Sequence, residues 1–305
     1  MEERKLIKQG GGGLTIYLPK KWVDRRGLKN GDNVRVLETD TSLIIEGDIN
    51  TKNEIKIDIN ESNIHDLRHL LTHAYRRGFS KIIISYNKPQ EIIKETKKVT
   101  SNVLLGFEVT SIEQKSIIIE NISEPSEEKF DVMLQKVFLV ISETNEVLLK
   151  DFTNGKFSSI DEIKELRDQG DKFIIFCKRL ITKNRNDKNS LLEWEFMTFL
   201  MDIHHNYYYL YHYAHDNKIK TNKNFSQLIK DLGLYFSDLR SAYLKRDVSI
   251  VHRINEQKKK YHFGEIIKLL EKSRGEENII YSYIREIFRS IQLSTSPIMS
   301  MSLGY

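Results

Sequence analysis

The sequence predicts a multidomain α+β protein with a β-rich N-terminal domain, a small α/β unit and a C-terminal bundle of about six antiparallel helices. Three observations predict this order. Short strand patterns and turn signals fill the first 48 residues. Strand and helix patterns then alternate over 49–123, and long apolar stripes at helical spacing follow. In a chain of 305 residues, domains are therefore expected at 1–48, 49–123 and 124–305.

The first domain is expected to contain short strands and one short helix. Strands are predicted over residues 14–18, 34–37 and 43–45, a helix over 20–26, and turns over 30–32 and 39–42. Pro19 ends the first strand because it has no N–H for a ladder. Gly27 can close the helix in a left-handed conformation. Trp22, a large aromatic residue, is expected in the core.

The second segment predicts the order β-α-β-α-β-β. Strands are expected over residues 54–59, 81–86, 107–109 and 116–120, and helices over 64–74 and 89–105. The unbroken isoleucine run at 82–84 predicts a strand that is buried on both faces. Gly78 and Gly106 end the two helices, and Pro89 suits the start of the second.

Six apolar stripes predict the helices of residues 124–305. They cover residues 130–148, 163–181, 196–214, 225–243, 248–270 and 280–291. The second stripe opens on a capping box from Ser159 to Glu162. The fifth is weaker because three lysines at 258–260 interrupt it. Short polar connections predict antiparallel neighbours, grouped as two three-helix halves.

Positive charge is concentrated near the N-terminus. Residues 4–35 hold nine Lys or Arg and two acidic residues, so the local net charge of +7 exceeds the +5 of the whole chain. Such a concentration is typical of a surface that binds a polyanion. The alternative is a solvated basic face with no partner.

Several classes of protein are excluded or disfavoured. One cysteine, Cys177, cannot form an internal disulfide or a multi-cysteine metal site, and it is expected in the core because it lies on an apolar stripe. No apolar run approaches the ~20 residues of a membrane span, and no leader segment is recognisable. A cytoplasmic protein without membrane insertion is expected. Phosphate-loop, nucleophile-elbow, zinc-protease and dinucleotide motifs are absent, so an enzyme is not expected.

The first domain carries a family resemblance. Its sequence reads Arg4-Lys5-x-x-x-Gln9-Gly10-Gly11-Gly12-x-x-Thr15-Ile16-x-Leu18-Pro19-Lys20-x-Trp22-Val23, followed by Gly27-Leu28-x-x-Gly31-Asp32-x-Val34. This pattern resembles the swapped-hairpin AbrB/SpoVT (MazE-like) DNA-binding domain. The whole layout, with Leu104-Leu105-Gly106-Phe107-Glu108-Val109 in the middle unit and six helices after it, resembles the archaeal PhoU-like phosphate uptake regulators.

The resemblance implies a homodimer or higher oligomer that binds duplex DNA. A swapped hairpin is half a barrel and needs a partner copy to complete its core. The candidate phosphate contacts are Arg4, Lys5, Lys8, Lys20, Lys21, Arg25 and Arg26. The glycine run at 10–13 would let a loop follow the groove closely, or would serve as a flexible tether.

The metal sites of PhoU-like proteins are expected to be missing here. Family members hold metal clusters with E/D-x-x-x-D motifs, and the first aligns on residues 167–171, with arginine at the first position and Asp168 one residue late. The second retains only Glu256 beside the three lysines. Hard cations need several convergent oxygen ligands, so neither metal nor cofactor is expected. Asp171 is instead expected to pair with a basic side chain.

One further polar group lies on the third predicted helix. Asp202, His205, His212 and His215 fall within one broad arc at 100° per residue, and His204 lies off it. Imidazole and carboxylate groups can bind zinc or iron. The favoured interpretation is a solvated or inter-bundle polar face, because His205 and His212 lie two turns apart.

The function expected from these features is a DNA-binding regulator of phosphate uptake or of phosphate-responsive transcription. The helical region would sense a signal or dock a partner, such as a phosphate ABC transporter ATPase or a sensor protein. One alternative is an adaptor that acts on the transporter without binding DNA. The other is an antitoxin-like protein whose C-terminal region masks a toxin.

Overall fold

The computed structural model of the chain divides into two compact units, Met1–Asn53 and Glu54–Tyr305. It describes residues 3–10, 12–38, 42–47, 53–60, 63–87, 89–123, 128–183 and 188–303. Within these ranges, every helix is too short or too polar to cross a membrane.

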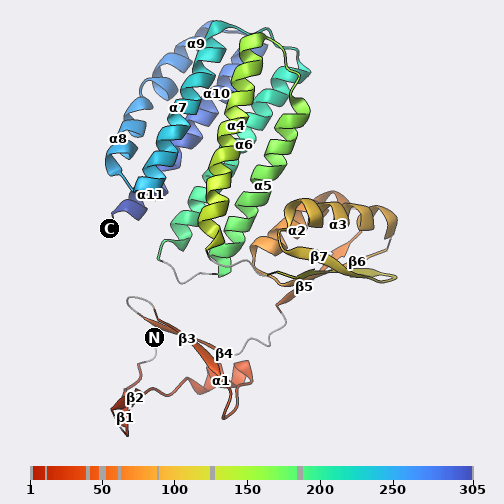
Figure 1. Cartoon of the computed structure of the whole chain (residues 1–305), viewed down its shortest axis with the longest axis vertical. Helices are drawn as coiled ribbons and strands as arrows, with labels where there is room; N and C mark the ends of the chain where they lie inside the picture. Colours follow the sequence, from red (N-terminus) through yellow and green to blue (C-terminus); the bar gives the residue numbers. More distant parts are fainter. Residues whose placement is uncertain are drawn as a thin grey trace. The chain divides into compact units, whose positions relative to one another are not determined.

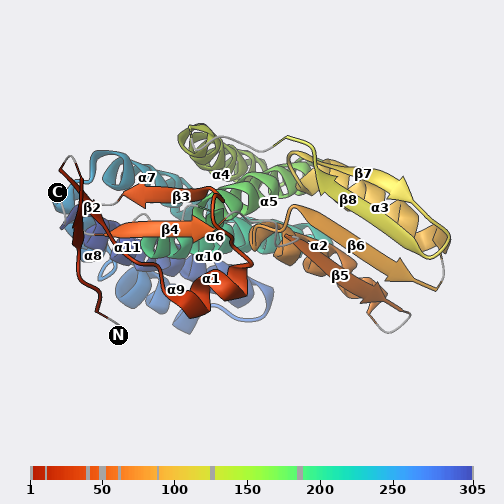
Figure 2. The ribbon, with the colours of Figure 1, turned by 90° about the horizontal axis from the view of Figure 1, so that it is seen from below.

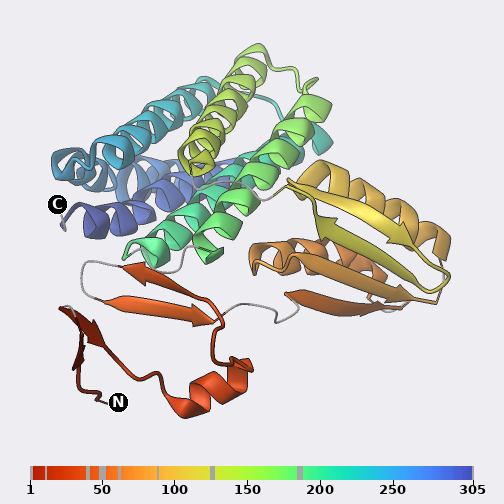
Figure 3. The ribbon, with the colours of Figure 1, turned by 60° about the horizontal axis from the view of Figure 1, so that its bottom comes forward.

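The first unit consists of two separate β-hairpins and one helix. Its elements are β1 (Ile7–Gln9), β2 (Gly13–Thr15), α1 (Lys20–Arg26), β3 (Val34–Glu38) and β4 (Leu43–Gly47). Each hairpin is a two-stranded antiparallel sheet, and no described strand joins the two (Figure 3). The helix and the last two strands confirm the sequence prediction. The first predicted strand is shorter than expected, and residues 39–41 of the second predicted turn lie outside the described residues.

Glycines make both the first hairpin and the end of α1. Gly10 and Gly12 have φ values of 38° and 103°, which L side chains rarely adopt, and the chain reverses there so that β1 pairs with β2. The strand β1 was not predicted, because the glycine run gave no sign that it was a turn. Gly27, with φ of 66°, caps α1 in the left-handed conformation, as predicted.

A four-stranded sheet begins the second unit. Its strands are β5 (Glu54–Ile59), β6 (Lys81–Tyr86), β7 (Phe107–Ile112) and β8 (Ser116–Asn121), in the order β5-β6-β8-β7 (Figure 2). Between them come η1 (Ile64–Asp66), α2 (Leu67–Arg76) and α3 (Pro89–Val103). The order of elements is the predicted one, and β5 and β6 are parallel while β8 is antiparallel to both of its neighbours.

The prediction of a strand buried on both faces was wrong. Ile82 and Ile84 are fully buried, but Ile83 lies half-exposed on the opposite face of β6. That face also carries the ion pair between Lys81 and Glu120 at 2.9 Å. The helices α2 and α3 cover one face only (Figure 3). Successive crossovers of the same hand along a sheet place their helices on the same side.

Long helices form the rest of the second unit (Figure 1). They are α4 (Lys129–Asn154), α5 (Ile160–Lys183), α6 (Ser190–Asp216), α7 (Lys223–Lys245), α8 (Val248–Gln257), the π-helical turn η2 (Tyr261–Glu265), α9 (Ile266–Lys272), α10 (Glu276–Leu293) and α11 (Thr295–Ser302). The predicted stripes lie along these helices and form one apolar core. The fifth stripe is split by η2, and α11 was not predicted.

The sheet and the long helices belong to one compact unit because α5 contributes to both cores. Ile175 of α5 packs into the core of the sheet, and α2 and α3 both contact α5. The fully buried Arg179 of α5 donates through Nη1 to the carbonyl oxygens of Tyr75 (2.8 Å) and Phe79 (2.9 Å) at the end of α2. A cation there offsets the partial negative charge of the helix C-terminus.

The expected capping box at the start of α5 does not form. In a capping box, the N–H of Ser159 would donate to the side chain of Glu162. It donates instead to Asp151 Oδ2 (3.2 Å) and to the hydroxyl of Tyr211 (2.7 Å). Asp151, at the end of α4, therefore organises this turn by accepting backbone N–H groups. The sequence analysis did not predict this, because Asp151 lies outside the local capping pattern.

Candidate nucleic-acid interface

Seven basic side chains of the first unit are exposed. Arg4 and Lys5 precede β1 and Lys8 lies within it, while α1 supplies the remaining candidates, Lys20, Lys21, Arg25 and Arg26. The structure therefore places the sequence-predicted residues on two elements, the first hairpin and α1.

Acidic residues neutralise little of this charge. Asp32 is engaged with its own loop, because its Oδ2 accepts the backbone N–H of Lys29 at 2.6 Å. Among the described residues, the four basic side chains of α1 have no carboxylate within ion-pair distance. Charged groups without a partner attract counter-ions or a polyanion.

The helix α1 begins with lysines at its electropositive end. Lys20 and Lys21 form its first turn, which contains no acidic residue. Cations at a helix N-terminus are unfavourable by a few tenths of a kcal/mol to about 1 kcal/mol. Arg25 and Arg26 occupy the last turn, where cations are favourable. The two arginines of α1 therefore stabilise the helix where they are, whereas the two lysines do not.

The first unit has no core of its own. Gly47 is its one buried residue among those described. Eight of its large apolar side chains are exposed by 36% to 67%: Leu6, Ile7, Leu14, Ile16, Tyr17, Val34, Val36 and Leu43. The others that the structure describes are half-buried: Leu18, Trp22, Val23, Leu28, Ile44 and Ile45. Trp22, expected in the core, is half-buried against Gly47. Two-stranded hairpins are at best marginally stable alone, so this unit lacks the packing that would hold it together.

Asp171 pairs with basic side chains, as predicted. Its Oδ1 lies 2.7 Å from Nε2 of His205, and its Oδ2 lies 3.6 Å from Arg68 and 3.7 Å from Arg167. Burial raises the pKa of this carboxyl, but His205 and the two arginines more than offset burial and leave the pKa below its usual value. Arg68 also contacts Asp168 at 3.2 Å, so the cluster joins α2 to α5 and α6.

His204 lies directly behind this cluster. It is fully buried, and Nε2 lies 3.0 Å from Oγ1 of Thr144, whose hydroxyl donates to the carbonyl of Val140. Because that hydroxyl already donates, it can only accept a hydrogen bond from the imidazole. Burial lowers its pKa to about 4, despite the opposing charge of Asp171. Gly170 lets α5 approach, because a Cβ there would collide with the ring.

The polar arc of α6 does not form one surface. Asp202 accepts a hydrogen bond from Ser290 of α10, whereas His205 turns toward α5. His212 and His215 each pair with Asp216 at 2.8 Å. Within the described ranges, no group of three or more His, Cys, Asp or Glu side chains is placed to hold a metal ion.

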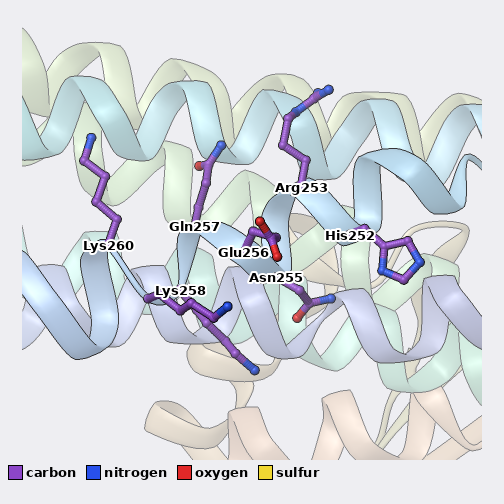
Figure 4. Close-up of a pocket in the computed structure, with 8 residues that line it drawn as sticks. His252, Arg253, Asn255, Glu256, Gln257, Lys258 and Lys260 are labelled. Carbon is purple, nitrogen blue, oxygen red and sulfur yellow. The ribbon is translucent and has the colours of Figure 1, made fainter.

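Glu256, the remnant of the second acidic motif, lines an open pocket of about 810 Å³. The three lysines at 258–260 line the same pocket (Figure 4). Cys177 is fully buried as predicted, and burial raises the pKa of its thiol.

Sequence reasoning missed Arg68, Arg179 and His204. Arg68 meets Asp168 across a hundred residues of sequence, and no local pattern signals such a pair. For His204, its place off the polar arc and beside Ile203 was a usable signal of burial. Comparisons with protein-family models, curated proteins and solved structures found no match to this chain.

Proposed function

We propose that this chain is a homodimeric DNA-binding regulator whose first unit contacts duplex DNA. The observation that carries the proposal is the combination in one unit of exposed basic side chains and an absent core. Neither feature contributes to the stability of a single chain.

A second copy of the same unit is the proposed source of the missing core. The apolar side chains of β2, β3 and β4 that one chain leaves exposed can pack against the same side chains of the partner. The free edges of both hairpins can pair in the same step, which removes four unprotected strand edges. Dimerisation also doubles the number of basic side chains on one face.

Duplex DNA is the polyanion proposed for this face. Non-specific affinity for DNA comes mainly from lysine and arginine contacts to phosphates. Lys20 and Lys21 are repelled by the positive end of α1, and a phosphate bound nearby would offset that unfavourable electrostatic energy. Arg4 and Lys5, which precede β1, and Lys8 within it add positive charge at the first hairpin.

The connection to phosphate uptake rests on the family resemblance of the sequence. On that basis, we propose that the DNA-binding unit regulates phosphate uptake or phosphate-responsive transcription, and that the helical unit receives the signal or docks the partner.

The dimer is tested by hydrogen exchange on the full chain. Val36→Asp places a charge in the proposed dimer core, so the amides of β3 and β4 should lose their protection while those of α4–α6 keep theirs. Leu191→Asp, at a site that is 84% exposed on α6, is the matched control. Protection of β3 and β4 that survives Val36→Asp would show that the core lies elsewhere.

DNA binding is tested by fluorescence anisotropy with a short duplex. The variant Lys20→Gln/Lys21→Gln/Arg25→Gln/Arg26→Gln should bind at least about a hundredfold more weakly in low salt, because it removes up to eight phosphate contacts from a dimer. The control removes four exposed lysines from the second unit, Lys94, Lys97, Lys98 and Lys115, and should bind within about threefold of the parent. An intact dimer that binds no duplex would instead favour the transporter adaptor or the antitoxin-like protein.

A further inference from the structure

The helix that follows α7 is interrupted by a tight, glycine-dependent turn. α8 ends at Gln257, a turn follows over residues 258–260, and the π-helical turn η2 leads into α9. A Cβ on Gly264 would lie 2.6 Å from the carbonyl oxygen of Lys259, so this turn requires glycine. Single π turns inside helices are frequent at functional sites. A sequence that favoured only helix stability would avoid both the glycine and the break.

The three lysines that follow α8 line one open pocket. Here Lys258, Lys259 and Lys260 all line the pocket that also contains Glu256. In Figure 4, the side chains of Lys260 and Lys258 extend in different directions from the turn.

The wall of the pocket is held by contacts to α10 and α11. Asn255 donates to Oγ1 of Thr295 (3.2 Å) and accepts from Nε2 of Gln292 (2.8 Å). Below the lysines, the ring of Tyr261 stacks on Phe288 with centroids 4.2 Å apart. The turn is therefore ordered before any ligand arrives, which lowers the entropy cost of binding.

Two of the lysines are free to bind a ligand. Among the described residues, Lys258 and Lys259 have no carboxylate within ion-pair distance, while Arg253 is engaged by Asp238 at 2.7 Å. Lys260 donates to the hydroxyl of Tyr261 at 3.1 Å and keeps two further N–H groups. Glu256 is the one carboxylate among the described lining residues.

The positive charge continues beyond this pocket. A neighbouring pocket of about 400 Å³ shares Lys259 and Lys260 and adds Lys268 and Lys272, one turn apart on α9, together with the carboxylate of Glu265. The two pockets are therefore lined by five lysines and two glutamates. A single monovalent anion would satisfy one or two of the lysines, whereas a chain of phosphate groups would satisfy most.

We infer that this lysine pocket binds a small ligand that carries several linked phosphate groups, such as an inorganic oligophosphate or the phosphate chain of a nucleotide. Lysine ammonium groups bind phosphate oxygens as mobile point charges and need no fixed geometry, which suits an open pocket. This inference concerns the second unit and is independent of DNA binding by the first.

The test is calorimetric titration of the full chain with tripolyphosphate, with inorganic phosphate and a short duplex as separate arms. Lys258→Gln/Lys259→Gln should weaken tripolyphosphate binding at least about tenfold. Lys97→Gln/Lys98→Gln, which removes two adjacent exposed lysines from α3, should leave it unchanged. Glu256→Gln should tighten it severalfold, because it removes the repelling carboxylate. Inorganic phosphate should bind more weakly than tripolyphosphate.

Three outcomes would overturn the inference. The first is no binding of tripolyphosphate at millimolar concentration. The second is an equal loss in the α3 control, which would mean diffuse attraction to the whole surface. The third is a pocket variant that weakens the duplex rather than tripolyphosphate, which would assign the lysines to nucleic acid. Thermal unfolding of each variant checks that the turn still folds.

Discussion

The two units of this protein differ in where their stability comes from. The second unit buries dozens of apolar side chains in two cores that share α5. The first leaves its apolar side chains exposed or half-buried and fully buries only Gly47 among its described residues. The first is also the unit in which basic residues are concentrated. The contrast supports our proposal that the second unit folds by itself, whereas the first needs a second copy for its core and a polyanion for its charge.

The largest effect is expected from the core of the second unit. Phe138→Ala removes a fully buried ring from α4 and should lower the free energy of unfolding of this unit by about 3–5 kcal/mol. Leu139→Ala, at the next position and 60% exposed, should change it by less than about 0.5 kcal/mol. Denaturant unfolding measures both. Equal effects at the two sites would mean that the helices pack through a different face.

Acid should destabilise the second unit through His204. Its pKa is 6.5 in the unfolded chain and about 4 when folded, so only the unfolded chain gains a proton as pH falls from 6.5 to 4. The buried neutral ring therefore contributes full stability above pH 6.5 and loses about 3 kcal/mol over that interval. The folded-state pKa of Asp171 is lowered from 3.8, so its protonation reduces the stability of the unit only when the pH falls below about 3.8.

Unfolding at pH 7 and pH 4.5 tests this dependence. His204→Gln should flatten it, whereas the exposed His65→Gln should not. Burial also lowers the pKa of His73 and His262, and both remain in the variants, so the difference isolates His204. An unchanged pH dependence in His204→Gln would show that its ring is not buried in solution.

A smaller effect is expected where α5 approaches α6. Gly170→Ala directs a methyl group into the ring of His204, and such overpacking costs about 1–3 kcal/mol, less up to ~1 kcal/mol gained in helix propensity. When His204 is already alanine, the same Gly170→Ala substitution should cost less stability than it does in the parent, because the ring that it would meet is gone. A double-mutant cycle with no coupling would contradict the contact.

The smallest effect is expected in the first hairpin. Gly12→Ala places a Cβ at φ of 103° and should destabilise the pairing of β1 with β2 by about 1 kcal/mol. Gly13→Ala, in β2, is the control, because its Cβ would lie at an ordinary contact distance of 3.9 Å from the carbonyl oxygen of Gln9 and its φ is not positive. Hydrogen exchange of residues 7–15 reports on the pairing. Equal exchange in the two variants would mean that the hairpin is not formed in solution.

The sequence predicted elements better than it predicted contacts. Apolar periodicity located the helices of the second unit and the order of its sheet, because these depend on local patterns. The half-exposed position of Ile83 depends on which face of the sheet the helices cover, and the turn at Ser159 depends on contacts with Asp151 and Tyr211. Local sequence patterns do not show either of these tertiary contacts. The basic residues of the first unit were found by counting charge. The roles of Arg179 and His204 were not predicted, because charged and polar side chains are expected at the surface and these two are buried.

The salt dependence of duplex binding by the full chain tests the central claim most directly. If three basic side chains per copy contact phosphates, a dimer makes six such contacts, and the slope of log affinity against log salt concentration should be about −5. Affinity should then fall about a thousandfold between 50 and 200 mM salt. A slope flatter than about −2, or no binding in 50 mM salt, would contradict the proposal that the first unit is a DNA-binding dimer.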